Sequence, residues 1–429
     1  MSKANTQNDV IDKISLNQFS ARQNSCLRIA VHDYAGHAFP FDLCKELASR
    51  GHVVQHLYFT QCQAPQATGG KGLAEGYRSR GLSIPGNFQK FSFIRRRFQE
   101  VEYGKVAARA IIESSPDVVI SANTPIDSQL EINAACRNHH IPMVHWLQDV
   151  ASVAMEKILP QKLPILGKQI ARFYRFQEAR MLRQSAAVVV ITSHFLDICS
   201  QMGVARDDCH VIENWAPLNE IQPRPRRNAW SEEQGLTDKR VLLYSGTLGF
   251  KHNPAIFERL AAHFQSQPDV RIVVISEGMG AAWLAERKAA LGLDNLILLP
   301  YQPYNRLSEV LGTGDLLLAI LEESAGIFSV PSKVLSYLSA GKAILLSVPL
   351  SNLAAETVRR AEAGRVIAPR DVEGLIAAAD DMLSDASMRE FMGRHGRIYA
   401  EKMFDASVIA DRFERVLSSV TPTFMHNGR

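Results

Sequence analysis

The chain lacks the features that mark membrane and secreted proteins. No stretch of its 429 residues approaches the run of about 20 apolar residues that crosses a bilayer. The longest apolar runs, at residues 186–191 and 316–321, have the length of strands. Residues 1–25 are polar and contain no apolar signal-peptide segment. We therefore interpret residues 1–25 as a flexible tail and expect a cytoplasmic protein.

Metal, disulfide and dinucleotide motifs are also missing. The six cysteines form neither a CxxC pair nor a repeated spacing, so they indicate no zinc site and no disulfide framework. The first βα loop has no GxGxxG fingerprint, which argues against NAD or FAD. No DxD-like triplet stands at the end of a predicted strand, so the sequence requires no divalent metal and no cofactor. The formal net charge of +4 is small for this length and gives no indication of a nucleic-acid partner.

What the chain does contain is the same pattern twice, which favours two α/β domains. In the first half, strands are predicted at residues 27–31, 53–59, 117–121, 142–147 and 187–192, with helices at 41–48, 105–113, 128–137 and 166–183. Such alternation predicts a parallel sheet covered by helices on both faces. Since this length exceeds one ordinary core, two domains are expected.

The second half restarts after residues 221–227, which hold two prolines and three arginines and are typical of an exposed linker. Further strands are predicted at 240–245, 270–276, 295–300, 315–320 and 343–348, and late helices at 254–265, 372–384, 388–401 and 406–419. We predict an N-terminal domain over 26–220, a linker over 221–239, a C-terminal domain over 240–402 and a final helix and tail over 403–429. Two doubly wound domains bind ligands in the crevice at the carboxyl ends of their strands.

The strongest chemical signal lies at residues 329–342. Pro331 and Ser332 are typical of a helix start, where backbone N–H groups favour an anion. A cation in the first turn, Lys333, opposes the helix dipole unless a phosphate lies in front of it. The alternative is an ordinary surface lysine; we favour the phosphate.

A second signal follows the predicted strand at 240–245. Gly246 and Gly249 permit the backbone to approach a ligand, and Lys251 can then reach a diphosphate. Cations there would stabilise the charge that develops on a leaving diphosphate. An ordinary strand–helix connection explains the pattern equally well.

Two further positions stand at predicted strand ends. Gly36 and His37 occupy the first βα loop, where a glycine can lie close to a sugar and His37 can carry a proton or simply be polar surface. Asp149 follows the strand at 142–147 and can accept a proton or bind sugar hydroxyls. A role as a helix N-cap or turn residue explains Asp149 equally well.

Two basic stretches can lie on anionic lipid. Residues 90–98 mix apolar side chains with four positive charges, and we consider them the better membrane candidate. In 166–183, Leu166, Ile170, Phe173 and Tyr174 share one helical face opposite the basic residues. For this second stretch we favour a helix packed on the sheet with a solvated outer side.

In this order, these motifs resemble the family-4 retaining glycosyltransferases of GT-B fold, and most of all the bacterial colanic-acid and exopolysaccharide branch. The resemblance runs from about residue 27 to 419. Its most specific segments are HDYAGH at 32–37, IENWAP at 212–217, SGTLG at 245–249 and VPSK at 330–333. It implies two tandem Rossmann-like domains facing a cleft, with the C-terminal helix crossing back onto the first domain.

The resemblance also implies roles for individual residues. Lys251 and Lys333 would bind the donor diphosphate, and with Asp149 they make up the predicted catalytic set. The predicted donor-binding residues are Gly36, Gly246, Thr247, Glu277, Gly278, Tyr301, Gln302, Pro331 and Ser332.

The chain departs from the family pattern at its glutamate pair. Phe328 and Ser336 occupy the two positions, and Glu322 and Glu323 match the first glutamate only across a gap. Gln148 stands where the family often has a histidine. The departures leave the predicted fold and diphosphate site in place and concern the catalytic set.

We therefore predict transfer of a sugar from a nucleotide-sugar donor to a glycan or a polyprenyl-diphosphate-linked acceptor in bacterial surface polysaccharide biosynthesis. Retention of anomeric configuration is implied by the resemblance alone. A peripheral position at an anionic inner membrane surface is a further expectation. Two alternatives remain: a nucleotide-sugar epimerase of the same fold, or a catalytically silent subunit that binds a nucleotide-sugar.

Overall fold

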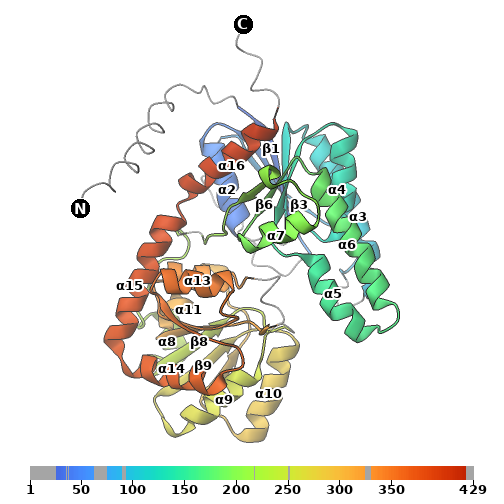
Figure 1. Cartoon of the computed structure of the whole chain (residues 1–429). Coiled ribbons are helices and arrows are strands. Elements are labelled where there is room, and N and C mark those ends of the chain that lie inside the picture. Colours follow the sequence, from blue (N-terminus) through green and yellow to red (C-terminus); the bar gives the residue numbers. More distant parts are fainter. Residues whose placement is uncertain are drawn as a thin grey trace, which may run out of the picture.

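The structure is a computed structural model. It describes residues 26–421 apart from 35, 37, 62–74, 89–92, 217, 250–251 and 324–329. Within this part of the chain the strands form two separate parallel sheets, one from each half of the sequence (Figure 1). The predicted fold class, two Rossmann-like domains in tandem, is confirmed.

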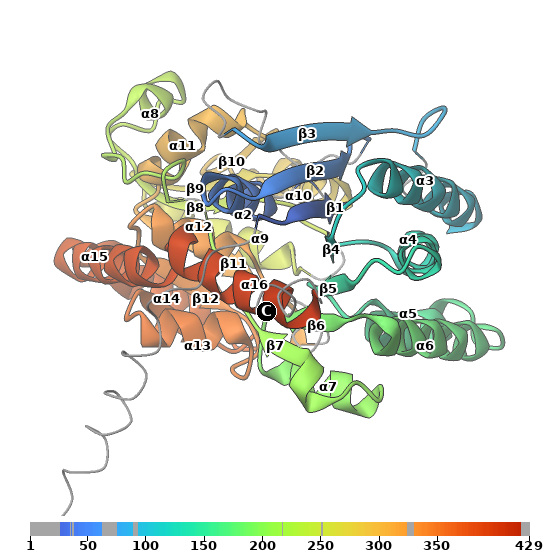
Figure 2. The same ribbon diagram turned by 90° about the horizontal axis from the view of Figure 1, so that it is seen from above.

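The N-terminal sheet has seven strands in the order β3-β2-β1-β4-β5-β6-β7. Strands β4, β5 and β6 are buried along their whole length, because helices cover both faces of the sheet. Seen from above, α2 and α16 lie on one side of the sheet and α3, α4 and α6 on the other (Figure 2). The strands are β1 (Arg28–Asp33), β2 (Val53–Phe59), β3 (Tyr77–Leu82), β4 (Val118–Ala122), β5 (Met143–Leu147), β6 (Ala187–Val190) and β7 (Cys209–Val211). The helices of this half are α2 (Ala38–Ser49), α3 (Phe93–Glu113), α4 (Ile126–Asn138), α5 (Ala151–Lys162), α6 (Gly167–Gln184) and α7 (His194–Gln201).

The C-terminal sheet has six strands in the order β10-β9-β8-β11-β12-β13. Side chains of α9, α10 and α14 fill the core on one face, and those of α11, α12 and α13 fill the other. The strands are β8 (Arg240–Ser245), β9 (Val270–Ile275), β10 (Leu296–Leu299), β11 (Leu316–Ile320), β12 (Ile344–Ser347) and β13 (Gly364–Ile367). The helices are α8 (Ala229–Glu233), α9 (Ala255–His263), α10 (Met279–Leu291), α11 (Leu307–Thr313), α12 (Lys333–Ser339), α13 (Leu353–Arg360), α14 (Val372–Ser384), α15 (Ala386–Met403) and α16 (Ala406–Val420).

The ten predicted strands are all present, and three further strands were missed. These are β3, with four exposed residues of six, β7, which is three residues long, and β13, in which no residue is fully buried. None of them has a run of buried apolar residues, so the hydrophobic pattern carries no signal for them. The segment predicted as a linker contains α8, whose Trp230 is fully buried.

The inner face predicted for α6 is right for Tyr174 and wrong for Leu166 and Phe173. Its buried stripe runs through Gly167, Ala171, Tyr174 and Glu178, whereas Phe173 is exposed, as is Leu166 just before the helix. The reason is that α6 packs on α5 and α4, so that neighbouring helices rather than the apolar periodicity select its inner face.

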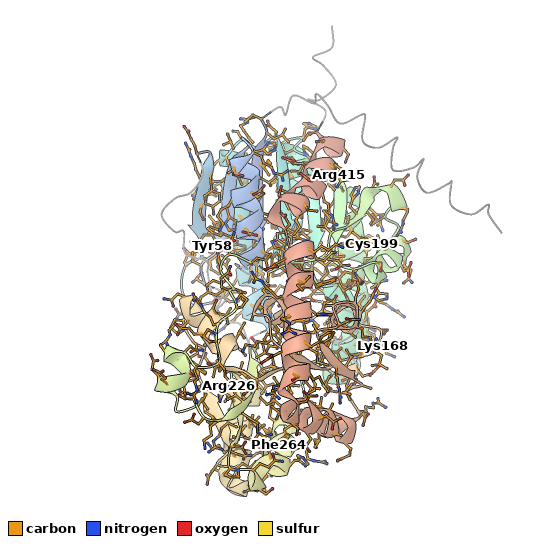
Figure 3. All side chains as sticks on the ribbon, turned by 90° about the vertical axis from the view of Figure 1, so that its left-hand side faces the viewer. Tyr58, Lys168, Cys199, Arg226, Phe264 and Arg415 are labelled. Atoms are coloured by element: carbon orange, nitrogen blue, oxygen red, sulfur yellow. The ribbon has the colours of Figure 1, made fainter. Side chains whose placement is uncertain are left out.

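The last two helices join the domains (Figure 3). Helix α15 packs on α12 of the C-terminal domain, and Arg397 donates to the Ser339 carbonyl at 2.6 Å. The chain then continues into α16, which begins after the N-cap Asp405 and packs on α2 of the N-terminal domain. The predicted crossing of the C-terminal helix is therefore confirmed.

Ionic and aromatic contacts hold α16 on the first domain. Arg50, at the end of α2, contacts Asp411 at 2.6 Å and Glu414 at 2.7 Å, and His52 contacts Glu414 at 3.0 Å. Beneath them Phe413 is fully buried, with its ring centroid 4.8 Å from that of Trp146. In the part of the chain that the structure describes, no helix has both the length and the apolar character to span a membrane.

We expect Phe413→Ala to lower the free energy of unfolding by about 3–5 kcal/mol, because it leaves a cavity against Trp146 and Trp215. Val408→Ala on the exposed side of α16 is the control and should change it by less than about 0.5 kcal/mol. Chemical denaturation of both variants measures this. Equal stability would show that α16 does not contribute to the first domain's core.

Candidate functional site

One of the two lysines predicted to bind a diphosphate, Lys333, lies at the carboxyl end of β8. The Nζ atom of Lys333, the first residue of α12, donates to the Tyr244 hydroxyl at 2.7 Å. It also lies 4.1 Å from the centre of the Tyr244 ring. The described parts of two clusters that are far apart in the sequence, 244–249 and 330–342, therefore lie together.

Two buried tyrosines hold this site in place. The Tyr244 hydroxyl donates to the Thr247 carbonyl at 2.7 Å, which fixes the turn after β8. The Tyr337 hydroxyl accepts from the Ser245 amide at 3.2 Å and donates to the Leu318 carbonyl at 3.2 Å. Burial raises the pKa of both phenols, so they stay neutral at physiological pH. Tyr244 thus positions the Lys333 ammonium without cancelling its charge.

Gly246 is the position where the backbone approaches Lys333. Its φ of +141° is one that side chains rarely adopt. A Cβ atom there would lie 2.9 Å from Lys333 Cε and 3.2 Å from Nζ. The glycine is therefore required by its conformation and by the lysine beside it.

The residues predicted to bind the nucleotide base border the same site. The hydroxyls of Thr247 and Tyr301 are 2.9 Å apart, and Glu277 accepts from the Tyr301 amide at 3.4 Å. Gly278, with φ of +101°, is the N-cap of α10. Gln302 points elsewhere, because its Oε1 accepts from the Trp230 indole at 3.0 Å. Gln302 is thus bound to α8, away from the Thr247–Tyr301 pair.

Three further predicted donor-binding residues lie at the start of α12 or in the first βα loop of the N-terminal domain. Pro331 is buried and Ser332 is the N-cap of α12, with no side-chain cap hydrogen bond. Gly36 is buried in the first βα loop with φ of +69°. Lys251, His37 and Phe328 lie outside the described residues, so the predictions for them stay predictions.

Asp149 follows β5 and is exposed, next to the buried Val150. The N-cap of α5 is Val150, so Asp149 does not have the capping role that the sequence allowed. The preceding Gln148 is buried and exchanges amide hydrogen bonds with Asn214. The Asp149 carboxylate is therefore accessible to a ligand at a strand end.

A cavity of about 610 Å³ lies between the domains. Its walls combine apolar side chains of both domains, among them Phe195, Ile198 and Leu353, with polar ones. The uncharged polar side chains are Thr192, His194, Ser351 and Asn352. Its charged groups are Lys157 of α5, Arg370 before α14 and Glu323 after β11. Val330, three residues before Lys333, also lines it.

Sequence reasoning missed several of these groups. Tyr244 was part of a predicted motif, but its role under Lys333 depends on a contact across 89 residues. Lys157 and Arg370 lie in segments with no motif, and only the packing of the two domains brings them to one cavity.

Two family models match the chain, one in each domain. The model described as "Glycosyl transferase 4-like domain" matches residues 38–215, and "Glycosyl transferases group 1" matches residues 226–399. The chain belongs to the family-4 glycosyltransferases of GT-B fold. Enzymes of this family use nucleotide-sugars as donors.

One curated relative belongs to the branch indicated by the sequence motifs. It is the putative colanic acid biosynthesis glycosyl transferase WcaI of Escherichia coli K12, 23% identical over 254 residues. The match covers 58% of this chain and 60% of the relative's length.

Solved glycosyltransferase structures share the fold over nearly the whole chain. HepE of Anabaena, in complex with UDP and glucose, has a TM-score of 0.68 at 14% identity and covers 92% of this chain and all of its own. WaaG, a glycosyltransferase of lipopolysaccharide biosynthesis, has a TM-score of 0.64 at 17% identity, with 91% and 99% coverage.

We expect Gly246→Ala to weaken nucleoside-diphosphate binding about tenfold, because the added methyl group would displace the Lys333 ammonium. Gly51→Ala is the control: its φ of 92° is also one that side chains rarely adopt, but no atom lies within 4 Å of the added methyl group. Isothermal titration of both variants measures the effect. Equal loss in both would assign it to backbone strain rather than to Lys333.

Proposed function

We propose that the protein transfers a sugar from a nucleotide-sugar to a glycan or lipid-linked acceptor in bacterial surface polysaccharide assembly. The observation that carries the proposal is the Lys333 ammonium, held at the end of β8 by the neutral Tyr244 hydroxyl. A fixed cation at that edge is what a leaving diphosphate requires. Lys251 would supply a second cation from the same loop.

In the proposed reaction, the bond between the anomeric carbon and the diphosphate oxygen breaks. Negative charge then develops on the diphosphate beside Lys333. The acceptor oxygen forms the new bond to the anomeric carbon, and its proton passes to a base, for which Asp149 is the candidate. Family resemblance favours retention of anomeric configuration, which NMR of the product's anomeric proton can test. We expect neither a metal ion nor a cofactor to be needed.

The proposed nucleotide site lies between β8 and β10. The Thr247–Tyr301 pair and Glu277 would border the base and ribose. UDP is the first nucleotide to test, because the Anabaena structure of the same fold contains UDP and glucose. Glu323 is the candidate substitute for the missing glutamate pair, since it lines the interdomain cavity together with Val330.

The interdomain cavity is the proposed acceptor site. Lys157 and Arg370 would attract a phosphate group, and the walls around Phe195 and Leu353 would cover apolar chain. This combination suits a polyprenyl-diphosphate-linked sugar. Such an acceptor would place the protein in the cytoplasm at the inner membrane surface.

Two alternatives predict different reactions. An epimerase of the same fold would release free sugar or an epimer without any acceptor. A silent subunit, favoured by Phe328 and Ser336 in place of the glutamate pair, would bind nucleotide and turn over no donor. Product analysis with and without a lipid-linked acceptor separates the three.

Lys333→Ala and Lys251→Ala should each weaken nucleoside-diphosphate binding roughly ten- to hundredfold, since each removes a charge-assisted contact. A thermal-shift titration with UDP, GDP, ADP, dTDP and the dinucleotide NAD measures this, because a ligand specific for the folded state raises Tm. Lys402→Ala, exposed on α15, is the control. Unchanged affinity in both variants, or a shift with NAD only, would contradict the diphosphate site.

Asp149→Asn should lower turnover by about 10²–10⁴-fold and leave donor affinity unchanged, because the amide cannot accept the proton. Asp197→Asn, exposed on α7 of the same domain, is the matched control. Turnover with a radiolabelled donor measures both. Full activity of Asp149→Asn would remove this residue from the mechanism.

A further inference from the structure

The hairpin formed by α5 and α6 carries an exposed apolar tip. Ile165 and Leu166, in the turn between the helices, are 82% and 62% exposed. Of the seventeen large hydrophobic side chains that are exposed in the described part of the chain, six fall within residues 158–176. They are Ile158, Leu163, Ile165, Leu166, Phe173 and Phe176. The hairpin extends from the N-terminal domain with this tip at its far end (Figure 1).

The same hairpin is strongly basic. Residues 151–184 contain seven Lys or Arg and two Asp or Glu, a net charge of +5, which exceeds the +4 of the whole chain. One acid, Glu178, is buried and accepts from the backbone amides of Ala151 and Ser152 at the start of α5. The other, Glu156, lies 3.9 Å from Arg175. Lys168 and Arg172 are exposed beside the tip.

The start of α3 adds to this surface. Phe98 is 72% exposed and follows the exposed Arg95, Arg96 and Arg97. Arg97 lies 3.5 Å from Asp127, which also accepts from Tyr174 of α6 at 2.6 Å. The two basic stretches of the sequence therefore adjoin through Asp127, although only residues 93–98 of the first are described.

We propose that the tip of the α5–α6 hairpin inserts into the surface of an anionic lipid bilayer. Exposed apolar side chains flanked by cations match the boundary between acyl chains and phosphate headgroups. Charge decides the occupant. The exposed Lys168 and Arg172 beside the apolar tip, on a hairpin of net charge +5, suit an anionic lipid and would repel a second copy of the same hairpin. This inference rests on the proposed function, because it supplies the surface on which a lipid-linked acceptor would be found.

The hairpin also leads to the proposed acceptor site. Lys157 of α5 lines the interdomain cavity, and the next residue, Ile158, is exposed on the hairpin. Bilayer contact at the tip would bring a lipid-linked diphosphate to the side of the cavity that Lys157 lines.

The test is cosedimentation of the full chain with sucrose-loaded vesicles of phosphatidylglycerol and phosphatidylcholine, against phosphatidylcholine alone. We expect binding to the anionic vesicles that falls with added salt. The double variant Ile165→Glu/Leu166→Glu and the variant Lys168→Glu/Arg172→Glu should each lower the partition coefficient about tenfold or more. The double variant Ile398→Glu/Val408→Glu, on exposed parts of α15 and α16, should bind as the wild type does.

Nucleoside-diphosphate binding by each variant, measured without vesicles, separates this inference from the proposed function. Retained nucleotide binding with lost vesicle binding supports the hairpin site and shows that the variants fold. Equal vesicle binding by the wild type and both hairpin variants would overturn it. Equal binding to anionic and neutral vesicles would also overturn it. A dimer that the hairpin substitutions dissociate, with vesicle binding unchanged, would overturn it as well. If the wild-type protein binds no nucleoside diphosphate, this would instead contradict the proposed function.

Discussion

The contact between Lys333 and Tyr244 links the sequence motifs to one site, and the rest of the C-terminal domain supports it. A lysine in the first turn of a helix opposes the helix dipole, so α12 accepts an unfavourable charge there. The neutral Tyr244 hydroxyl fixes the ammonium at 2.7 Å, and Tyr337 ties α12 to the ends of β8 and β11. Gly246 leaves the space that the lysine occupies. These are the features of a site prepared for an anion.

The parallel pairing of the strands gathers the loops of such a site at one edge of the C-terminal sheet, but it supplies groups from one domain only. Since every strand in a sheet points the same way, the loops after β8, β9 and β10 meet at one edge. In the proposed reaction the second reactant would come from the other domain. The Arg50–Glu414 contact and the buried Phe413 hold α16 on that domain while α15 stays on α12. The chain thus crosses from the first domain to the second and back again. The interdomain cavity therefore lies between two domains that two chain segments connect.

The sequence predicted what short-range patterns determine and missed what packing determines. Buried apolar runs located ten strands, and β3, β7 and β13 escaped because they bury too little. A glycine after a predicted strand indicated Gly246, and a lysine at a predicted helix start indicated Lys333, since the chemistry there depends on residue type. The inner face of α6 and the role of Gln302 depend on neighbours distant in sequence, α5 and Trp230. Periodicity alone cannot supply such neighbours.

The distribution of charge gives the α5–α6 hairpin and the rest of the molecule different surroundings. The net charge of the α5–α6 hairpin is +5 and that of the whole chain is +4. The remaining chain therefore has a net charge of −1 and is close to neutral. A near-neutral body with one basic, apolar-tipped projection orients itself in an electric field that decays from a lipid surface within about 8–10 Å. Of the described chain, the projection and the adjoining start of α3 would lie within that distance. The diphosphate site, which belongs to the other domain, would then stay in water, where nucleotide-sugars are dissolved.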